Sequence, residues 1–124
     1  MIPTKGKEKL RKRVRDYLEA GKTIDDLIRD FQHGIIPLSC DSDLVCGIGR
    51  LSTGCNDPFL VCCIVHDLEY IKKEMCQQDK TRYQVDREFY DCMTKHVESG
   101  NGSYARRNTY YGIVRSTAWI WWIF

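Results

Sequence analysis

Apolar residues recur at helical intervals in two segments near the amino terminus. In the first, three apolar residues spaced by four predict a helix over 7–20, which Gly21 would end. These residues are Leu10, Val14 and Leu18. The second segment follows Thr23, a residue type that favours the N-cap position, and it precedes Gly34, which would end a second helix. The apolar face of this second helix consists of Ile24, Leu27, Ile28 and Phe31.

Two longer helices are predicted in the second half of the chain, over about 58–75 and 81–97. Asn-Asp-Pro at 56–58 supplies a capping acid and a proline at the first helical position, and Gly100 follows the second helix. The preceding segment, 38–57, holds three glycines and three cysteines. Such a composition is typical of an irregular loop.

An antiparallel pairing of these two helices brings several reactive residue types level with one another. Cys92 would lie within about one helical turn, roughly 5 Å, of Cys62. Asp86 would face the gap between His66 and Tyr70, which are four residues apart and therefore share one helical face. The register thus predicts a cross-linked helix pair with a His–Asp contact between its members.

This arrangement permits general-base chemistry. A neutral imidazole with one nitrogen held by a carboxylate presents its other nitrogen as a proton acceptor. Asp67, next to His66 but about 100° around the helix, offers a hard oxygen ligand for a cation. Backbone carbonyls around Gly47 and Gly49 could add further oxygen ligands, because glycine permits the tight curvature required. The sequence therefore predicts a metal-assisted hydrolytic site.

Cysteine usage indicates the compartment. Seven cysteines among 124 residues are typical of a small disulfide-bonded protein in an oxidising setting, and the odd number leaves one thiol free or paired with another chain. We therefore expect a secreted or extracellular domain. The charged first twenty residues contain no apolar core of a signal peptide, and no window approaches the roughly 18 apolar residues of a membrane span.

Positive charge is concentrated at the amino terminus. Residues 1–22 contain eight Lys and Arg against three acids, a net charge of +5, so the remainder carries −3. This distribution suits an anionic membrane surface, although a solvated helix face explains it equally well. Nucleic acid is not an expected partner, because aromatic residues are not interleaved with the basic ones beyond Tyr17.

A single ordered pattern runs through residues 45–92. It reads C-G-x-G, twelve residues, C-C-x-x-H-D-x-x-Y, fifteen residues, D, five residues, C. This pattern resembles that of the calcium-dependent secreted phospholipase A2 family. The stretch "CGIGRLSTG" looks most like the calcium loop of the bee-venom-type branch, and "VDREFYDC" looks like the second long helix of the family.

The resemblance implies a role for each matched residue. His66 would take a proton from the attacking water, Asp86 would orient that imidazole, and Tyr70 would hydrogen-bond Asp86. Ca²⁺ would be held by the carboxylate of Asp67 and by three backbone carbonyls, those of Val45, Gly47 and Gly49. The amide of Gly47 would help to stabilise the oxyanion. The implied reaction is Ca²⁺-dependent hydrolysis of the sn-2 ester of a glycerophospholipid at a membrane surface.

The resemblance also implies two disulfides, Cys46–Cys63 and Cys62–Cys92. One further family disulfide is missing at both ends, because Glu69 and Val85 stand where its cysteines would be. The resemblance implies no partner for Cys40, Cys55 and Cys76. We expect Cys40 and Cys55 to pair across the calcium loop and Cys76 to be unpaired or bonded to another chain.

We therefore expect one mainly α, disulfide-rich, phospholipase A2-like domain over 1–124. Its parts are amino-terminal helices over 1–37, a calcium loop over 38–57, the catalytic helix pair over 58–98 and an aromatic segment over 99–124. Two other functions stay open. A non-catalytic binding or toxin-like module of the same fold is disfavoured because both His66 and Asp67 are present. A structural zinc module on "CCxxH" is disfavoured because adjacent cysteines lack the spacer that wraps a tetrahedral site.

Overall fold

The computed structural model describes residues 4–38, 56–119 and 122. Within these ranges the chain forms five α-helices and no strand, so the prediction of a mainly α chain that contains a disulfide is confirmed. The helices are α1 (Thr4–Glu19), α2 (Ile24–Gln32), α3 (Leu60–Glu74), α4 (Arg82–Glu98) and α5 (Tyr104–Thr117). None of the described helices is both long and apolar enough to cross a membrane.

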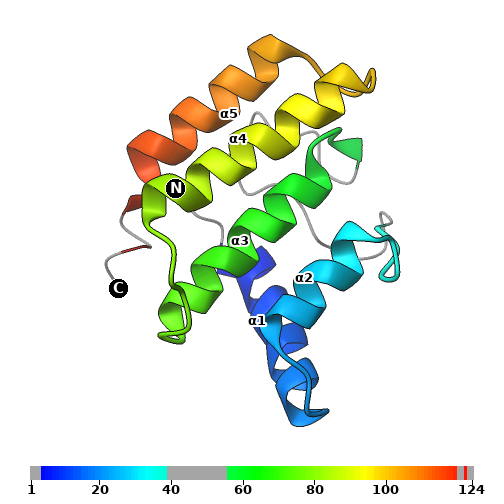
Figure 1. The fold of residues 1–124 in the computed structure, drawn as a ribbon, viewed down its shortest axis with the longest axis vertical. Coiled ribbons are helices and arrows are strands. Elements are labelled where there is room, and N and C mark those ends of the chain that lie inside the picture. The colour runs from blue at the N-terminus through cyan, green and yellow to red at the C-terminus, as the bar shows by residue number, and fades with distance from the viewer. Residues whose placement is uncertain (1–3, 39–55, 120–121, 123–124) are drawn as a thin grey trace.

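Four of the helices lie side by side in the order α2, α3, α4, α5, and α1 crosses behind α2 and α3 (Figure 1). The apolar core fills the space between neighbouring helices. Its fully buried members come from every helix and include Val14, Leu27, Leu68, Val85 and Tyr110. α3 is central, since it contacts α1, α2 and α4.

Capping boxes fix where α2 and α4 begin. The Thr23 hydroxyl accepts a hydrogen bond from the Asp26 amide at 3.1 Å, and the Asp26 carboxylate accepts one from the Thr23 amide at 2.8 Å. Thr81 and Gln84 form the same pair of bonds at 3.1 and 2.8 Å. Two otherwise unpaired amides are satisfied at each start. The cap at Thr81 therefore fixes where α4 begins.

The start of α3 differs from the prediction of a helix from residue 58. The helix begins at Leu60, and residues 58 and 59 form a turn before it; the Asp57 carboxylate caps this turn through the Phe59 amide, as expected for a capping acid. One oxygen of Asp57 accepts a hydrogen bond from the Phe59 amide at 2.9 Å, and the other accepts one from the Tyr110 hydroxyl of α5. Gly102 packs so closely on the Phe59 ring that an added Cβ would lie 2.7 Å from it.

Left-handed residues end four of the helices. The glycines predicted to stop helices, Gly21, Gly34 and Gly100, have φ values of 78°, 71° and 89°. Cys76 takes the same place after α3 with a φ of 57°, although it is not a glycine. Its amide bonds to the Lys73 carbonyl at 3.1 Å, the usual way to satisfy the last carbonyls of a helix.

α5 was not predicted, since residues 99–124 were expected only as an aromatic segment. The helix starts after Ser103, whose hydroxyl accepts a hydrogen bond from the Arg106 amide at 3.1 Å. Its buried face consists of Tyr110 and Val114, continued by Ala118 four residues further on. This four-residue spacing was the signal in the sequence that could have revealed the helix.

Candidate functional site

Three side chains from α3 and α4 meet in the interior. His66 and Tyr70 lie one turn apart on α3, and both contact Asp86 of α4. The His66 Nε2 atom lies 2.7 Å from Asp86 Oδ1, and the Tyr70 hydroxyl donates a hydrogen bond to the same oxygen at 2.6 Å. Asp86 is fully buried, and His66 and Tyr70 are only 6% and 1% exposed. The structure thus brings together the three residues to which the sequence assigned catalytic roles.

Asp86 is held in its charged form. Burial alone would raise the pKa of this carboxyl, but hydrogen bonds from His66, Tyr70 and Arg115 outweigh burial and lower it. A charged carboxylate only accepts hydrogen bonds, so Nε2 of His66 must carry the proton that it shares with Asp86. In a neutral imidazole, the lone pair is then on Nδ1. Within the described residues, the His66 ring makes no other hydrogen bond, so Nδ1 is available to accept a proton.

Aromatic rings fix the plane of the imidazole. The rings of Tyr70 and Phe89 flank His66, each with its centroid 4.6 Å from that of the imidazole. The Trp122 ring packs edge-on against Tyr70 at a centroid distance of 5.1 Å. Trp122 therefore packs beside the candidate site, whereas Trp119 is 47% exposed. An imidazole held in this way can rotate little without losing both its hydrogen bond and its ring contacts.

A small pocket reaches the imidazole between α2, α3 and α4. Its volume is about 90 Å³, and His66, Val65 and Phe89 contribute to its wall. A cavity of this size holds a few water molecules. His66 thus borders a space in which a water molecule could approach it.

Two arginines complete the surroundings of Asp86, and the sequence analysis did not find them. Arg115 of α5 donates a hydrogen bond from Nη1 to Asp86 Oδ2 at 2.7 Å. The Nε atom of Arg82 lies 3.6 Å from the same oxygen. Arg82 precedes Asp86 by four residues on one helix, a spacing that could have indicated this ion pair. Arg115 gave no such signal, since it lies 29 residues away on a helix that was not expected.

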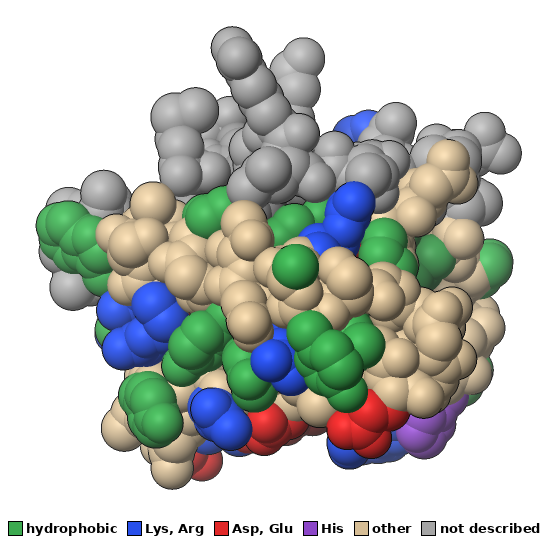
Figure 2. Space-filling view, turned by 90° about the horizontal axis from the view of Figure 1, so that it is seen from above, with side chains coloured by type: hydrophobic (Ala, Val, Ile, Leu, Met, Phe, Trp, Pro, Cys, Tyr) green, Lys and Arg blue, Asp and Glu red, His purple; other side chains and the backbone are tan. Residues whose placement is uncertain are grey.

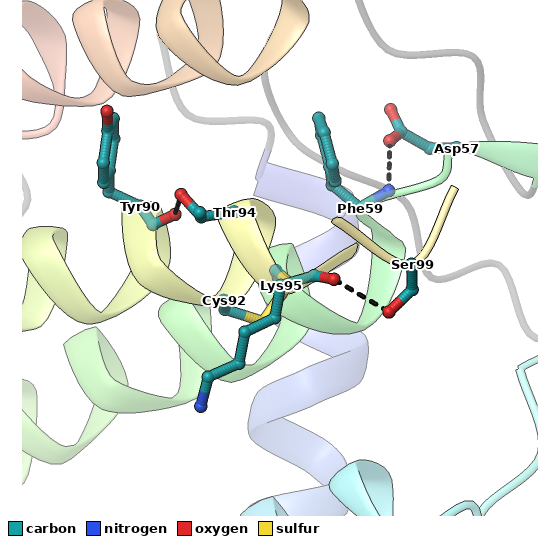
Figure 3. The surroundings of a disulfide bond; sticks show 8 residues. Asp57, Phe59, Tyr90, Cys92, Thr94, Lys95 and Ser99 are labelled. Atoms are coloured by element: carbon teal, nitrogen blue, oxygen red, sulfur yellow. Dashed lines mark hydrogen bonds between the residues drawn. A yellow bond between two sulfur atoms is a disulfide. The ribbon is translucent and has the colours of Figure 1, made fainter. Parts of the chain in front are cut away.

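A disulfide joins α3 and α4 next to these residues (Figure 3). It links Cys62, one turn before His66, to Cys92, with an S–S distance of 2.07 Å. Cys63 is also disulfide-bonded, but its expected partner, Cys46, lies outside the described residues. Cys76 carries a free, exposed thiol.

The expected calcium ligands are described only in part. Asp67 is half-buried on α3 and offers the kind of oxygen that Ca²⁺ prefers. The loop that would supply the carbonyls of Val45, Gly47 and Gly49 lies outside the described residues. The residues present are thus compatible with a calcium site at Asp67, and the remaining ligands stay a prediction.

A different group of metal-binding residue types does occur among the described residues. Ligand atoms of Cys62, Cys92 and His96 lie within 4.8 Å of one another. The two sulfur atoms are bonded to each other, however, and a metal requires thiolates. Cys63 is oxidised too. These bonds argue against zinc coordination by "CCxxH".

One of the two positions of the family disulfide that this sequence lacks belongs to an ion-pair cluster. Glu69 is buried on α3, and its carboxylate lies 2.8 Å from Lys80 and 3.4 Å from Lys72. Val85, the other position of the missing disulfide, is buried in the core. The Gln78 side chain also donates a hydrogen bond to the Glu69 carbonyl at 2.9 Å. These contacts tie the α3–α4 connection to α3.

Comparisons of the chain with protein-family models, with curated proteins and with solved structures found no match. The chemistry of His66 and Asp86 can be argued from their own geometry. That geometry is a buried imidazole with one nitrogen on a charged carboxylate and the other nitrogen without a hydrogen-bond partner in the described residues. Such an arrangement can activate a water molecule.

Proposed function

We propose that the protein hydrolyses the sn-2 ester of glycerophospholipids at a membrane interface, with Ca²⁺ as cofactor. The observation that carries the proposal is the bond of 2.7 Å between His66 Nε2 and the fully buried Asp86. It leaves the lone pair of Nδ1 for general-base chemistry. The substrate class is inferred from the sequence pattern that resembles the phospholipase A2 family. This pattern contains His66, Asp67, Tyr70 and Asp86 in the order typical of that family.

In the proposed reaction, His66 Nδ1 takes a proton from a water molecule as the water oxygen attacks the sn-2 carbonyl carbon. The imidazolium that forms is stabilised by the negative charge of Asp86. When the ester bond breaks, the proton passes from Nδ1 to the departing oxygen. The products are a free fatty acid and a lysophospholipid. Tyr70 supports this cycle by holding Asp86 in place.

Asp67 would hold the cofactor together with the backbone carbonyls of Val45, Gly47 and Gly49. When bound, Ca²⁺ supplies Lewis-acid stabilisation of negative charge on the ester carbonyl oxygen. Asp67 follows His66 directly, so one helix would carry both the base and the carboxylate ligand.

We further propose that α3 and α4 are the cross-linked antiparallel helix pair of this fold. The contacts between them support this arrangement, because positions that rise along α3 meet positions that fall along α4. Cys62 is bonded to Cys92, and Tyr70, two turns after Cys62, is bonded to Asp86.

An anionic membrane surface is the proposed site of action. Figure 2, seen from above, shows Lys and Arg side chains interspersed with hydrophobic ones, with acidic side chains near the lower edge. Helix α5 contains three arginines and no acid. On α1, Lys12 and Arg15 are exposed, whereas Arg11 is paired with Glu74 of α3 at 2.7 Å and so supports the fold.

The test is release of labelled fatty acid from the sn-2 position of phosphatidylglycerol vesicles, with Ca²⁺ and with a chelator. We expect release by the wild-type protein only in the presence of Ca²⁺. His66→Gln should lower the rate by roughly 10²- to 10⁴-fold, the usual contribution of a general base. His33→Gln, a substitution of an exposed histidine at the end of α2, is the matched control and should keep the wild-type rate.

Calorimetric titration with Ca²⁺ separates binding from chemistry. His66→Gln should bind the ion as the wild-type protein does, and Asp67→Asn should bind it more weakly. Equal fatty-acid release with and without chelator would exclude the proposed mechanism. Vesicle binding without any hydrolysis would instead support the non-catalytic binding module.

A further inference from the structure

One side chain of helix α5 reaches the buried carboxylate of Asp86. Arg115, in its last turn, donates its Nη1 hydrogen bond to Asp86 Oδ2 at 2.7 Å. The Arg115 side chain is 34% exposed, and the Asp86 side chain is entirely buried. A cation at the surface of the molecule is thus bonded directly to the carboxylate that holds His66.

Arg82 holds the last turn of α5 in place. Its Nη2 atom donates hydrogen bonds to the carbonyls of Val114 and Arg115 at 2.9 and 2.7 Å. Carbonyls in the last turn of a helix carry the negative end of its dipole, which a guanidinium stabilises. Arg82 also donates from Nε to the Tyr70 hydroxyl at 3.3 Å. One guanidinium therefore connects α5 to α3 and α4.

The two oxygens of Asp86 have different partners. Oδ1 accepts from His66 and Tyr70, whereas Oδ2 accepts from Arg115 and lies 3.6 Å from Arg82. A carboxylate with short hydrogen bonds on both oxygens cannot turn about its own axis without breaking at least one. Without Arg115, Oδ2 would keep only the longer contact with Arg82, and the carboxylate could turn away from His66.

We propose that Arg115, held by Arg82, is a positioning residue that fixes the Asp86 carboxylate against Nε2 of His66. α5 is then part of the functional site, although its hydrogen bond goes to Asp86 and not to the imidazole itself. The consequence for catalysis rests on the proposed function. The consequence for the His66–Asp86 bond does not, and it can be measured in a protein without activity.

The experiment compares Arg115→Ala and Arg115→Lys with Arg107→Ala as matched control. Arg107 lies on the same helix, where it stacks on Tyr90 and Tyr104 with its guanidinium 4.2 and 4.7 Å from their ring centroids. It therefore tests the loss of an arginine from α5 without loss of the bond to Asp86. Thermal unfolding of each variant establishes that it is folded.

The first readout is the proton on Nε2 of His66, observed by NMR in ¹⁵N-labelled protein. In the wild-type protein this buried, hydrogen-bonded proton should give a resolved imidazole N–H signal in slow exchange with water. Arg115→Ala should shift and broaden this signal, because the carboxylate is no longer fixed. Arg115→Lys should retain it in part, since an ammonium can still donate to Oδ2, and Arg107→Ala should leave it at the wild-type position.

The second readout is the rate of fatty-acid release. Arg115→Ala should lower kcat about 10- to 100-fold, while KM stays unchanged. The magnitude is taken by analogy from metal sites, where loss of the groups that orient a ligating histidine has an effect of this size. A wild-type N–H signal in folded Arg115→Ala would overturn the positioning role whatever the activity. If Arg115→Ala does not fold, a wild-type signal in Arg115→Lys together with an altered one in Arg107→Ala would overturn it. A shifted signal in a protein that hydrolyses no lipid would uphold the positioning role and refute the proposed function.

Discussion

Removal of the Cys62–Cys92 disulfide should weaken the fold without dismantling the site. The bond closes a loop with a sequence separation of 30 residues. On the chain-entropy treatment, closing such a loop lowers the entropy of the unfolded chain by about 12 cal/mol/K, or about 3.6 kcal/mol at 25 °C. Cys62→Ala/Cys92→Ala should therefore lower the free energy of unfolding by about that amount and the Tm by roughly 10–20 °C.

The assay is urea unfolding of the double variant and of its parent, both carrying Cys76→Ala to remove the exposed free thiol. Because the bond acts mainly on the unfolded chain, the urea dependence of the unfolding free energy should steepen as the unfolded state expands. The His66 N–H signal should persist at 25 °C, since Asp86 and Tyr70 still hold the ring. A loss of stability below about 1 kcal/mol, or loss of that signal in a folded variant, would refute this reasoning.

Three further predictions concern buried charges and hydroxyls. Tyr110→Phe should lower the free energy of unfolding below pH 10, because burial and the bond to Asp57 raise the pKa of Tyr110 from 10 to about 12. This stabilisation should be lost as the pH rises through 12. An ultraviolet titration of the phenolate with parallel unfolding curves would record both effects. Asp86→Asn should destabilise the fold by about 3–5 kcal/mol at pH 7. The difference from wild type should shrink as the pH falls below about 4, because the unfolded chain then takes up a proton at this carboxyl while the folded chain, with its lowered pKa, does so only at lower pH. A constant difference in urea unfolding down to pH 2 would contradict the lowered pKa. Glu69→Gln should lower the free energy of unfolding by about 1–3 kcal/mol in the same urea assay, because it weakens the pairing of a buried side chain with Lys80. An unchanged urea midpoint would show that this ion pair contributes nothing to stability.

Much of the local structure follows from short-range rules that can be read in the sequence. Thr23 and Thr81 cap helices because their hydroxyls reach amides three residues further along the chain. Gly21 and Gly34 end helices because they adopt positive φ at low cost. The spacing of four between His66 and Tyr70 puts both on one face of α3.

The position of Asp86 opposite His66 and Tyr70 was also predictable. In an antiparallel pair, the helical rise per residue relates each position along α4 to a position along α3. The calcium loop predicted over 38–57 falls largely outside the described residues, and the catalytic roles and the lipid substrate stay predictions for the assays above.

The tertiary structure alone revealed two further partners of the buried carboxylates. Asp57 was expected to cap the start of α3, and one of its oxygens does accept the Phe59 amide, but its second bond, to Tyr110 far along the chain, was not predicted. Arg115 reaches Asp86 only because α5 packs on α4. Helix propensity and capping act over a few residues and are therefore encoded locally, whereas the bonds that satisfy a buried carboxylate depend on which helices the folded chain brings together.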